Sequence, residues 1–512
     1  MRIGIDVGGT NTDGVLIDNS NNIISSYKTN TSNDVNTAVK LCIEKLINNI
    51  DKKNIDLIIV GTTHLINDLI QRKNLSKTGV VRLCGPSTRL LKPLSDWPKE
   101  LINKNLFLSH FASGGLEFDG REISPVIESE IKKICETFKS NKVESIAING
   151  VFASIDPYQE IHVSKIIAQE MGDIPVSLSH QIGRIGLLER ENATILNSML
   201  IKSAKRTFAN LSKIIKELKL NSKIYITQND GTMSSVSDAI KYPIFSLSSG
   251  PTNSMRGASF LSGIDNGLVV DIGGTSTDIG MLINSFPKES SIAVDFSGIR
   301  TNFRMADVLS IPLGGGTMIN NHAPFVSELS VGNEITSKSL SFGGKVPTVT
   351  DVYSSESKIN FSTPNKKINI NKNIISSAKQ EIKEKISVAI DRMKTNSNTI
   401  NTVIVGGGAF VMPNDIKGIN LIEIPKHSEV ANAIGSAFAQ VSGYSEKVFA
   451  TGNMTRDEIL LSSKNEAIKN AISKGADKNT IEIIDVEEIP LAYLPSNAIT
   501  VKTRVVGNIQ NN

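Results

Sequence analysis

Two stretches of the chain repeat the same acids, glycines and threonines in the same order. The first reads IDVGGTNTDG from Ile5, and the second reads VDIGGTSTDIG from Val270. Neither contains the GK[ST] of a Walker loop or the GxGxxG that opens a dinucleotide-binding helix. In both copies an apolar run with strand character follows the second acid, which predicts a strand, a turn and a returning strand. The matched positions are Asp6, Gly8, Gly9, Thr10, Thr12 and Asp13 in the first copy, and Asp271, Gly273, Gly274, Thr275, Thr277 and Asp278 in the second.

The glycines and hydroxyl groups of these turns are suited to phosphate. A glycine pair leaves backbone N–H groups free to approach a ligand closely, and threonine hydroxyls add further donors. Two such hairpins at matching places in two halves would face each other across a cleft. The residues predicted to bind phosphate are Gly8, Gly9, Thr10, Asn11 and Thr12, together with Gly273, Gly274, Thr275, Ser276 and Thr277.

The acids that open the two copies predict a cation. A carboxylate about 4 Å from a phosphate oxygen is repelled by about 4 kcal/mol at an effective dielectric of roughly 20. Asp6 and Asp271 would therefore oppose phosphate binding unless a cation lay between them. Mg²⁺ held by carboxylates, waters and phosphate oxygens is the usual solution. The alternative is a pair of ordinary β-turns, but repetition of the whole pattern favours a phosphate and Mg²⁺ site.

A third glycine cluster, VIVGGGAFVMP, ends a buried strand. One interpretation is a backbone shelf beneath the adenine and ribose of a nucleotide, where Gly406, Gly407 and Gly408 allow close approach. The other interpretation is a tight turn from a strand into a helix. The cluster alone does not decide between the two.

The elements expected to position these motifs follow an α/β pattern. Apolar runs such as LIIVGTT, KIYITQND and TVIVGGG alternate with helical segments, and several are continuously apolar, as in sheets covered on both faces. We expect long helices at about 191–220 and 376–393, and a helix at 429–441 whose small residues let another helix approach closely. The segment 330–373 is interpreted as loops with short strands. The tail beyond 443 contains one helix and two strand-like runs, which predicts a small α+β appendage.

Composition argues against several classes of protein. The 512 residues are 39% hydrophobic and 21% charged, which is ordinary for a globular protein. The net charge of +4 comes from 55 basic and 51 acidic residues, and no basic run with interleaved aromatic residues supports a nucleic-acid or membrane-surface role. The cysteines, Cys42, Cys84 and Cys135, are too scattered for a disulfide framework or a CxxC metal site. No signal peptide or long apolar span is recognisable, so we expect a cytoplasmic protein.

The order of hairpin, second hairpin and strand-GGG resembles the layout of the actin-like ATPase superfamily. Within it, the chain resembles the A-type, ATP-binding subunit of the hydantoinase/oxoprolinase family over about residues 1–440. The matching segments include VGTTHLINDLIQRK, GGLEFDGREI, VSLSHQIGRIGLLERENATILN, SSGPTNSMRGASFLSG, PLGGGTMI and GGKVPTVTDV. The resemblance implies two actin-like (ribonuclease H-like) α/β domains around a nucleotide cleft. We expect the first hairpin in a domain of residues 1–190, the second hairpin and the GGG loop in 191–443, and the appendage in 444–512.

The same resemblance implies ATP-dependent attack on a cyclic amide, such as a hydantoin, oxoproline or another lactam, through phosphorylation of its carbonyl oxygen. Carried over by motif, Asp6 and Asp271 would handle Mg²⁺, and the glycine loops would hold ATP. Asp13 or Asp278 would orient the attacking group or simply cap its hairpin. Departures from the family pattern at His64 and in VVRLCGPST leave the substrate open.

The A-type subunits of the family commonly work with a B-type subunit, and we expect such a partner here, since the 444–512 tail is too short for another large catalytic domain. A homo-oligomer is also compatible with the sequence. The alternatives are a small-molecule kinase of the same superfamily and an ATP-switched reactivating or chaperone-type binding protein.

Overall fold

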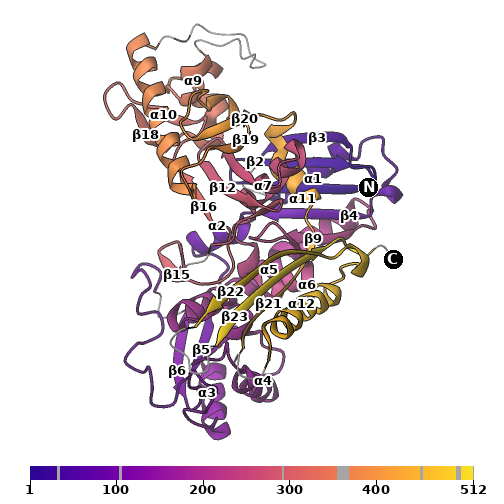
Figure 1. The fold of residues 1–512 in the computed structure, drawn as a ribbon, viewed down its shortest axis with the longest axis vertical. Coiled ribbons are helices and arrows are strands. Elements are labelled where there is room, and N and C mark those ends of the chain that lie inside the picture. The colour runs from indigo at the N-terminus through magenta and orange to yellow at the C-terminus, as the bar shows by residue number, and fades with distance from the viewer. Residues whose placement is uncertain are drawn as a thin grey trace.

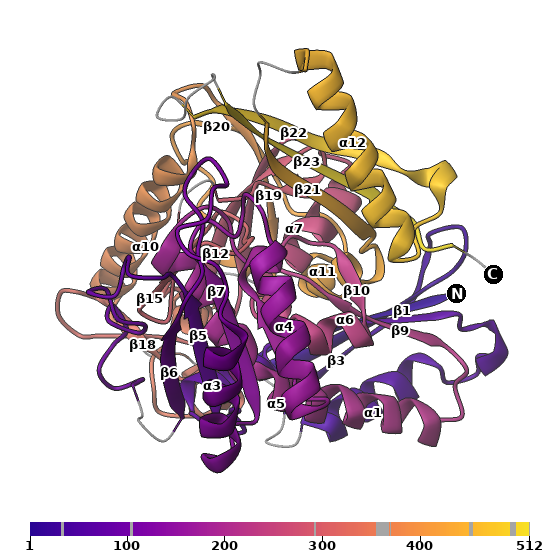
Figure 2. The same cartoon turned by 90° about the horizontal axis from the view of Figure 1, so that it is seen from below.

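The computed structural model describes residues 1–31, 35–102, 106–290, 293–354, 368, 370–449, 454–491 and 498–510. Its strands form three larger sheets with helices packed on their faces, which confirms the predicted α/β class (Figure 1). The first and last described residues lie on the same side of the molecule in both ribbon views (Figures 1 and 2).

The first sheet has nine strands in the order β22-β23-β21-β10-β9-β4-β1-β2-β3. At one end β1, β2 and β3 form an antiparallel meander, and β1 pairs in parallel with β4, which pairs in parallel with β9. At the other end β21 pairs with β10 and with β23, so the tail beyond 443 adds its strands to the sheet that holds the first hairpin. The bounds are β1 (Arg2–Val7), β2 (Asn11–Ile17), β3 (Ile23–Asn30), β4 (Leu57–Thr62), β9 (Lys223–Thr227), β10 (Met233–Ser235), β21 (Val441–Phe449), β22 (Glu482–Pro490) and β23 (Ile499–Gly507).

The second sheet repeats the arrangement around the first hairpin. Its first strand, β11, pairs antiparallel with β12 and parallel with β19, as β1 does with β2 and β4. The strand β19 continues in parallel to β20, and β12 pairs antiparallel with β16 and β13. The repeated sequence is therefore matched by a repeated topology. The bounds are β11 (Gly267–Ile272), β12 (Thr277–Ile283), β13 (Phe286–Pro287), β16 (Val308–Ile311), β19 (Ile400–Val405) and β20 (Ile419–Glu423).

A third, all-parallel sheet lies within the first part of the chain, between β4 and the long helix α5. Its order is β6-β5-β7-β8, and α3 and α4 pack on it. Two antiparallel ribbons, β14-β15 and β17-β18, complete the strands. The bounds are β5 (Thr78–Leu83), β6 (Phe107–Ala112), β7 (Ser145–Gly150), β8 (Val176–Leu178), β14 (Val294–Phe296), β15 (Ile299–Thr301), β17 (Thr317–Ile319) and β18 (Val326–Ser330).

The helices include the predicted long ones. The helix expected at 191–220 is α5 (Leu187–Glu217), the helix expected at 376–393 is α10 (Lys372–Met393), and the one expected at 429–441 is the shorter α11 (Ala431–Ala437). The described part of 330–373 is mainly helical rather than strand-like, and 355–367 lies outside the described residues. The remaining helices are α1 (Val35–Leu46), α2 (His64–Ile70), α3 (Glu128–Ser140), α4 (Tyr158–Met171), α6 (Val236–Lys241), α7 (Ser249–Ser262), α8 (Ile335–Lys338), α9 (Val349–Ser354) and α12 (Arg456–Ser473). Short 3₁₀ helices occupy Lys52–Asn54, Ser179–Gln181, Pro243–Ser246, Gly332–Glu334, Leu340–Phe342, Ala409–Val411, Ser428–Val430 and Lys478–Thr480.

Each main sheet is fixed by its own apolar core. Ile5 of β1 and Ile58 of β4 lie in a buried cluster with Phe208 of α5. In the second sheet, Val270 of β11 lies in a buried cluster with Ile382 of α10. Burying one such side chain contributes about 1.5–3 kcal/mol, so these cores hold in place the strands whose ends form the two hairpins.

The helices α7 and α11 cross between the two main sheets. The helix α7 contacts β1 and β4 of the first sheet and β11 and β19 of the second. A Cβ atom at Gly435 would overlap the carbonyl oxygen of Asn253, and one at Gly257 would overlap that of Ala431. The expectation that small residues in this helix allow close approach is therefore confirmed, and the crossing joins the two halves tightly.

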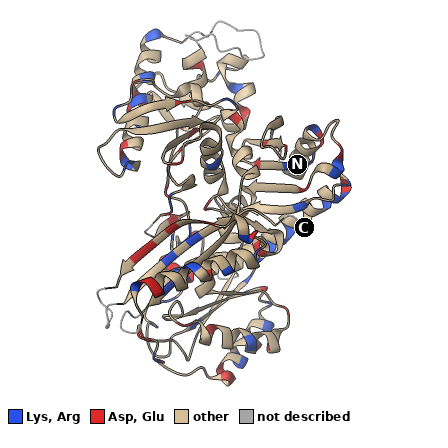
Figure 3. Cartoon of the chain, turned by 45° about the vertical axis from the view of Figure 1, so that its right-hand side comes forward, with Lys and Arg blue, Asp and Glu red and all other residues tan. Residues whose placement is uncertain are grey.

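The tail is an α+β segment. Figure 2 shows α12 lying along β21 and β23, and Gly443 of β21 leaves no room for a Cβ atom against Ala467 of α12. In Figure 3 the positions of basic and acidic residues are interspersed along the ribbon. Among the described residues, no helix is long and apolar enough to cross a membrane.

Candidate functional site

The two hairpins have the same backbone geometry. In each, the two acids pair in register across the strands, and the first glycine donates its N–H to the carbonyl oxygen three residues later at 2.9 Å. The residues involved are Asp6, Asp13, Gly8 and Asn11 in the first hairpin, and Asp271, Asp278, Gly273 and Ser276 in the second. The predicted strand-turn-strand structure is present in both copies.

The second glycine of each turn faces open space. A Cβ atom added at Gly9 or at Gly274 would meet no atom within 4 Å, and the same is true of Gly407 in the GGG loop. Each of these glycines lines the same cavity. The backbone at these positions is therefore accessible to a ligand, as phosphate binding by N–H groups requires.

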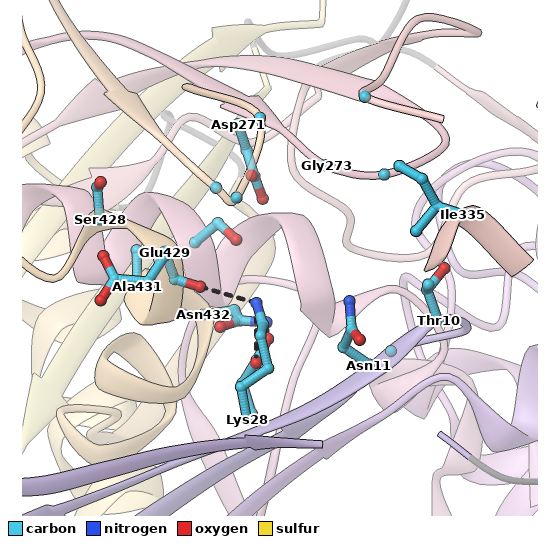
Figure 4. A pocket seen from close by; sticks show the side chains of 18 of the residues that line it. Thr10, Asn11, Lys28, Asp271, Gly273, Ile335, Ser428, Glu429, Ala431 and Asn432 are labelled. Carbon is cyan, nitrogen blue, oxygen red and sulfur yellow. Dashed lines mark hydrogen bonds and ion pairs between the residues drawn. The ribbon is translucent and has the colours of Figure 1, made fainter. Parts of the chain in front are cut away.

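This cavity has a volume of about 480 Å³ and lies between the two hairpin turns and the GGG loop. Its size is within the range of roughly 300–1,000 Å³ that is typical of small-molecule sites. Figure 4 shows Lys28 and Asn11 below the cavity and Asp271 above it in that view. Three parts of the chain that are far apart in sequence thus form one site.

Most of the predicted phosphate and nucleotide residues line the cavity, and two of the threonines outside it form hydrogen bonds within the protein. The lining contains Gly8, Gly9, Thr10, Asn11, Asp13, Asp271, Gly273, Gly274, Gly406, Gly407 and Gly408. Outside it lie Asp6, Thr12, Thr275, Ser276, Thr277 and Asp278. The hydroxyl group of Thr277 donates to the carbonyl oxygen of Leu313 at 2.6 Å, and that of Thr12 lies 3.1 Å from the hydroxyl of Thr31. These threonines are therefore engaged in holding their hairpins.

The acids of the first hairpin are buried and already have partners. Asp6 is 4% exposed and accepts hydrogen bonds from the side-chain amides of Asn253 at 2.9 Å and Asn432 at 3.1 Å. The Asn432 amide also donates to Asp13 at 2.9 Å, and the ammonium group of Lys28 lies 3.0 Å from the other oxygen of Asp13. Burial raises the pKa of Asp6 to about 6 despite these donors, and burial also raises the pKa of Asp13.

The acids of the second hairpin have fewer partners. Burial raises the pKa of Asp271, while a hydrogen bond with Ser254 and the charge of Lys28 act in the opposite direction. Burial and repulsion from Asp271 raise the pKa of Asp278 to about 6, and a hydrogen bond with Ser310 opposes them. Among the described residues, neither of these acids has a pair of amide donors like that of Asp6.

Two glycine-rich loops support the turn of the second hairpin. The N–H groups of Gly315 and Gly316 donate to the carbonyl oxygens of Gly273 at 3.0 Å and Gly274 at 2.7 Å. The N–H of Gly408 donates to Ile272 at 2.7 Å. The PLGGGT and VIVGGG loops therefore pack directly against the turn.

The GGG cluster fits both interpretations made from the sequence. It leads β19 into the 3₁₀ helix Ala409–Val411, and it also lines the cavity. Gly406 has a φ of +90°, and a Cβ atom there would overlap a carboxylate oxygen of Asp271. The turn thus requires glycine for its own backbone and for close contact with the second hairpin.

Several cavity residues were not predicted from the sequence. Lys28 lies on β3 in register with Asp13, and Asn432 is the second residue of α11. Neither belongs to a recognisable local pattern. The glycines at 314–316 did offer a signal, because they repeat the triplet at 406–408. The further lining residues are Lys28, Ser254, Gly315, Gly332, Ile335, Phe342, Thr350, Phe410, Ser428, Glu429, Ala431 and Asn432.

The cavity fits a metal ion that arrives with a polyphosphate. Within the described residues, no group of three or more His, Cys, Asp or Glu side chains is arranged to bind a metal alone. Asp13, Asp271 and Glu429 are the carboxylates that line the cavity. Mg²⁺ commonly takes one or two carboxylates and completes its shell with water and phosphate oxygens, so this donor set is suitable.

Comparison with protein families gives two adjoining matches. Residues 2–171 match the hydantoinase/oxoprolinase N-terminal region, and residues 190–373 match the hydantoinase/oxoprolinase domain. The first match covers the first hairpin and the strands β5, β6 and β7 of the third sheet, and the second covers the crossing helix α7 and the second hairpin.

Two curated relatives share this region of the chain. The alpha subunit of caprolactamase from Pseudomonas jessenii is 25% identical over 378 residues, which cover 68% of this chain and 53% of the relative. The gamma subunit of acetophenone carboxylase from Aromatoleum aromaticum is 24% identical over 392 residues, which cover 68% of this chain and 52% of the relative. The matched part of this chain thus covers about half the length of each of these relatives.

Two solved structures share the fold. The ATP-dependent caprolactamase from Pseudomonas jessenii has a TM-score of 0.79 at 19% identity, with 100% of this chain and 88% of that chain covered. The nucleotide-free acetone carboxylase has a TM-score of 0.69 at 16% identity, with 99% and 88% covered. The arrangement of sheets described above therefore exists in experimentally solved proteins.

Proposed function

Because the chain belongs to the hydantoinase/oxoprolinase family, we propose that it is the ATP-binding subunit of an enzyme that hydrolyses a cyclic amide. The observation that supports this most directly is the cavity at which both hairpins and the GGG loop meet. The relationship to the alpha subunit of caprolactamase supports a lactam, hydantoin or oxoproline as the substrate class.

In the proposed complex, the phosphates of ATP lie between the turns 8–12 and 273–277. The backbone N–H groups at Gly9 and Gly274 donate to them, since these are the positions that face open space. The adenosine rests on residues 406–408. Asp271 would hold Mg²⁺ from the second hairpin. Asp6 lies outside the cavity and would orient the side-chain amide of Asn432, which also donates to Asp13. When bound, Mg²⁺ neutralises phosphate charge that the carboxylates would otherwise repel.

The proposed chemistry transfers a phosphoryl group and then opens the ring. The carbonyl oxygen of the amide attacks the terminal phosphorus of ATP, and ADP leaves. A first water then adds to the activated carbon, and the C–N bond breaks as the ring nitrogen takes up a proton, which leaves an amine and an acyl phosphate. A second water hydrolyses the acyl phosphate to the carboxylic acid and inorganic phosphate. Of the two acids predicted to orient the attacking group, Asp13 lines the cavity and Asp278 does not, so Asp13 is the better placed.

The test is a product analysis with a panel of cyclic amides. We expect the purified chain to bind Mg·ATP, to hydrolyse it slowly and to open no ring, and a B-type partner subunit to couple ADP formation to loss of the substrate. Ring opening by the chain alone, with ADP formed in step, would contradict the need for a partner. A stable phosphorylated product would instead indicate a small-molecule kinase, and ATP turnover stimulated by a protein without loss of any small molecule would indicate a switch protein.

A further inference from the structure

Lys28 has an unusual position for a residue that belongs to no motif. Among the described residues that line the cavity, it is the one Lys or Arg, whereas Asp13, Asp271 and Glu429 contribute negative charge. A nucleoside polyphosphate brings further negative charge to the same cavity. The position of this ammonium group therefore matters for binding.

The Lys28 side chain reaches the cavity from the strand next to the first hairpin. Its ammonium group lies 3.0 Å from a carboxylate oxygen of Asp13 and donates to the carbonyl oxygen of Glu429 at 3.0 Å. Figure 4 shows the side chain extending from β3 into the cavity, with the bond to Glu429 dashed. The side chain is 37% exposed, whereas that of Asp13 is 4% exposed. The carboxylate is therefore fixed, and the ammonium group is free to change its partner.

Asp13, the ion-pair partner that Lys28 would give up, is also a candidate neighbour of Mg²⁺. Asp13 lines the cavity opposite Asp271, and a Mg²⁺ ion near both would compete with the ammonium group for the oxygen of Asp13. An ion pair with one partly exposed member is easily exchanged. A displaced lysine on a flexible stem finds its next strongest partner in a phosphate oxygen.

We propose that Lys28 binds the terminal phosphate of ATP and so makes the site selective for nucleoside triphosphate over diphosphate. This inference rests on the proposed function, because it assumes that the cavity binds ATP. The competing role is permanent neutralisation of Asp13, in which case Lys28 would affect triphosphate and diphosphate alike. The two roles differ in the ratio of ATP to ADP affinity.

The experiment compares Lys28→Met with Lys40→Met by calorimetry with Mg·ATP and with Mg·ADP. Lys40 is a matched control, because its ammonium group is also 3.0 Å from a carboxylate, that of Glu217, and its side chain is 40% exposed. Loss of one charge-assisted phosphate contact should weaken ATP binding roughly 10- to 100-fold. ADP binding should change by less than about threefold, and Lys40→Met should change neither. Lys28→Arg should keep most of the preference for ATP, because it keeps the charge.

The outcomes separate this inference from the proposed function. Equal weakening of ATP and ADP by Lys28→Met, or no change in either, would overturn the role of Lys28 alone. A wild-type chain that binds neither nucleotide would overturn the proposed function and this inference with it. If Lys28→Met does not fold, as judged by its thermal unfolding, Lys28→Gln provides the same comparison of ATP with ADP.

Discussion

The first and second hairpins have the same sequence pattern and the same turn, but their acids have different surroundings. In the first, two asparagine amides and a lysine cover Asp6 and Asp13. In the second, Asp271 lines the cavity and forms a hydrogen bond with Ser254, and the supporting groups are glycine loops that bond to the backbone of the turn. The acids of the first hairpin thus already have polar and charged partners, whereas Asp271 of the second hairpin faces the cavity.

The two copies of the motif therefore need not have the same role. A buried carboxylate that already accepts hydrogen bonds has less to gain from a metal than one that faces a cavity. We therefore assign the stronger contribution to Mg²⁺ binding to Asp271. Variants of the α7–α11 crossing and of the hairpin residues can test this division.

Replacing Gly435 by Leu should have the largest effect. Its Cβ atom would overlap the backbone of Asn253, which cannot move without shifting α7, so we expect the free energy of unfolding to fall by about 3 kcal/mol or more. The halves should also fail to close on nucleotide, which small-angle scattering would show as an absence of compaction. Gly250→Ala on α7 is the control, because a Cβ atom there meets no atom within 4 Å. Unchanged turnover and compaction in the Gly435 variant would show that closure of the two halves on nucleotide does not depend on the α7–α11 crossing.

Asp271→Asn should reduce Mg²⁺-dependent ATP affinity by roughly 100-fold, because it removes the negative charge of a carboxylate proposed to coordinate Mg²⁺. Asp6→Asn should cost only about tenfold, because Asp6 acts through Asn432. Calorimetry with and without Mg²⁺ measures both. Equal losses would show that the two hairpins contribute alike, and unchanged binding in both variants would rule out the metal site.

Asp278→Asn should stabilise the nucleotide-free protein at neutral pH. The folded-state pKa is raised to about 6, above the ordinary value of 3.8, so the folded state binds this proton more tightly and loses stability as the pH rises between these values. The variant should gain about 1–2 kcal/mol at pH 7 and almost nothing at pH 4, since one pKa unit corresponds to about 1.4 kcal/mol and partial exposure weakens the effect. Denaturant unfolding at the two pH values measures this. Asp18→Asn, at an exposed acid whose pKa is lowered by hydrogen bonds, should show no such gain.

The smallest effect is expected from Gly9→Ala and Gly274→Ala. Neither Cβ atom would meet a protein atom, so the free energy of unfolding should change by less than about 0.5 kcal/mol. Each methyl group would extend into the cavity, and ATP affinity should fall by about three- to tenfold. Competition binding with a fluorescent nucleotide would detect this. Unchanged affinity in one variant alone would show that the phosphates contact only the other turn.

The sequence was informative where the chemistry lies in a local pattern. Both hairpins, the glycine triplet at 406–408 and the long helices follow from residue spacing, because backbone geometry at such places depends on near neighbours. Lys28, Asn253 and Asn432 could not be assigned in this way. Their partners are Asp13 on the adjoining strand and Asp6 at the opposite end of the chain, so their roles exist only in the folded arrangement.

The local sequence also did not predict where the helix expected at 429–441 ends or which strands the tail pairs with. The helix expected at 429–441 ends at Ala437, because β21 begins at Val441 and enters the first sheet. The strands β22 and β23 were recognisable as strands, but a strand pattern does not name its neighbour. Pairing partners separated by most of the chain are set by packing rather than by local preference.

The nine-stranded sheet pairs strands that are far apart in the sequence, and this affects how the chain folds during its synthesis. During synthesis, the strand β10, near residue 233, cannot pair with its neighbour β21 until the ribosome has passed Val441. Throughout that interval the growing chain presents an unpaired sheet edge, which is a template for association with other chains. Contacts between segments so distant in sequence also form slowly. We therefore expect nascent or truncated chains that lack β21 to depend on chaperones and to aggregate more readily than chains that contain β21.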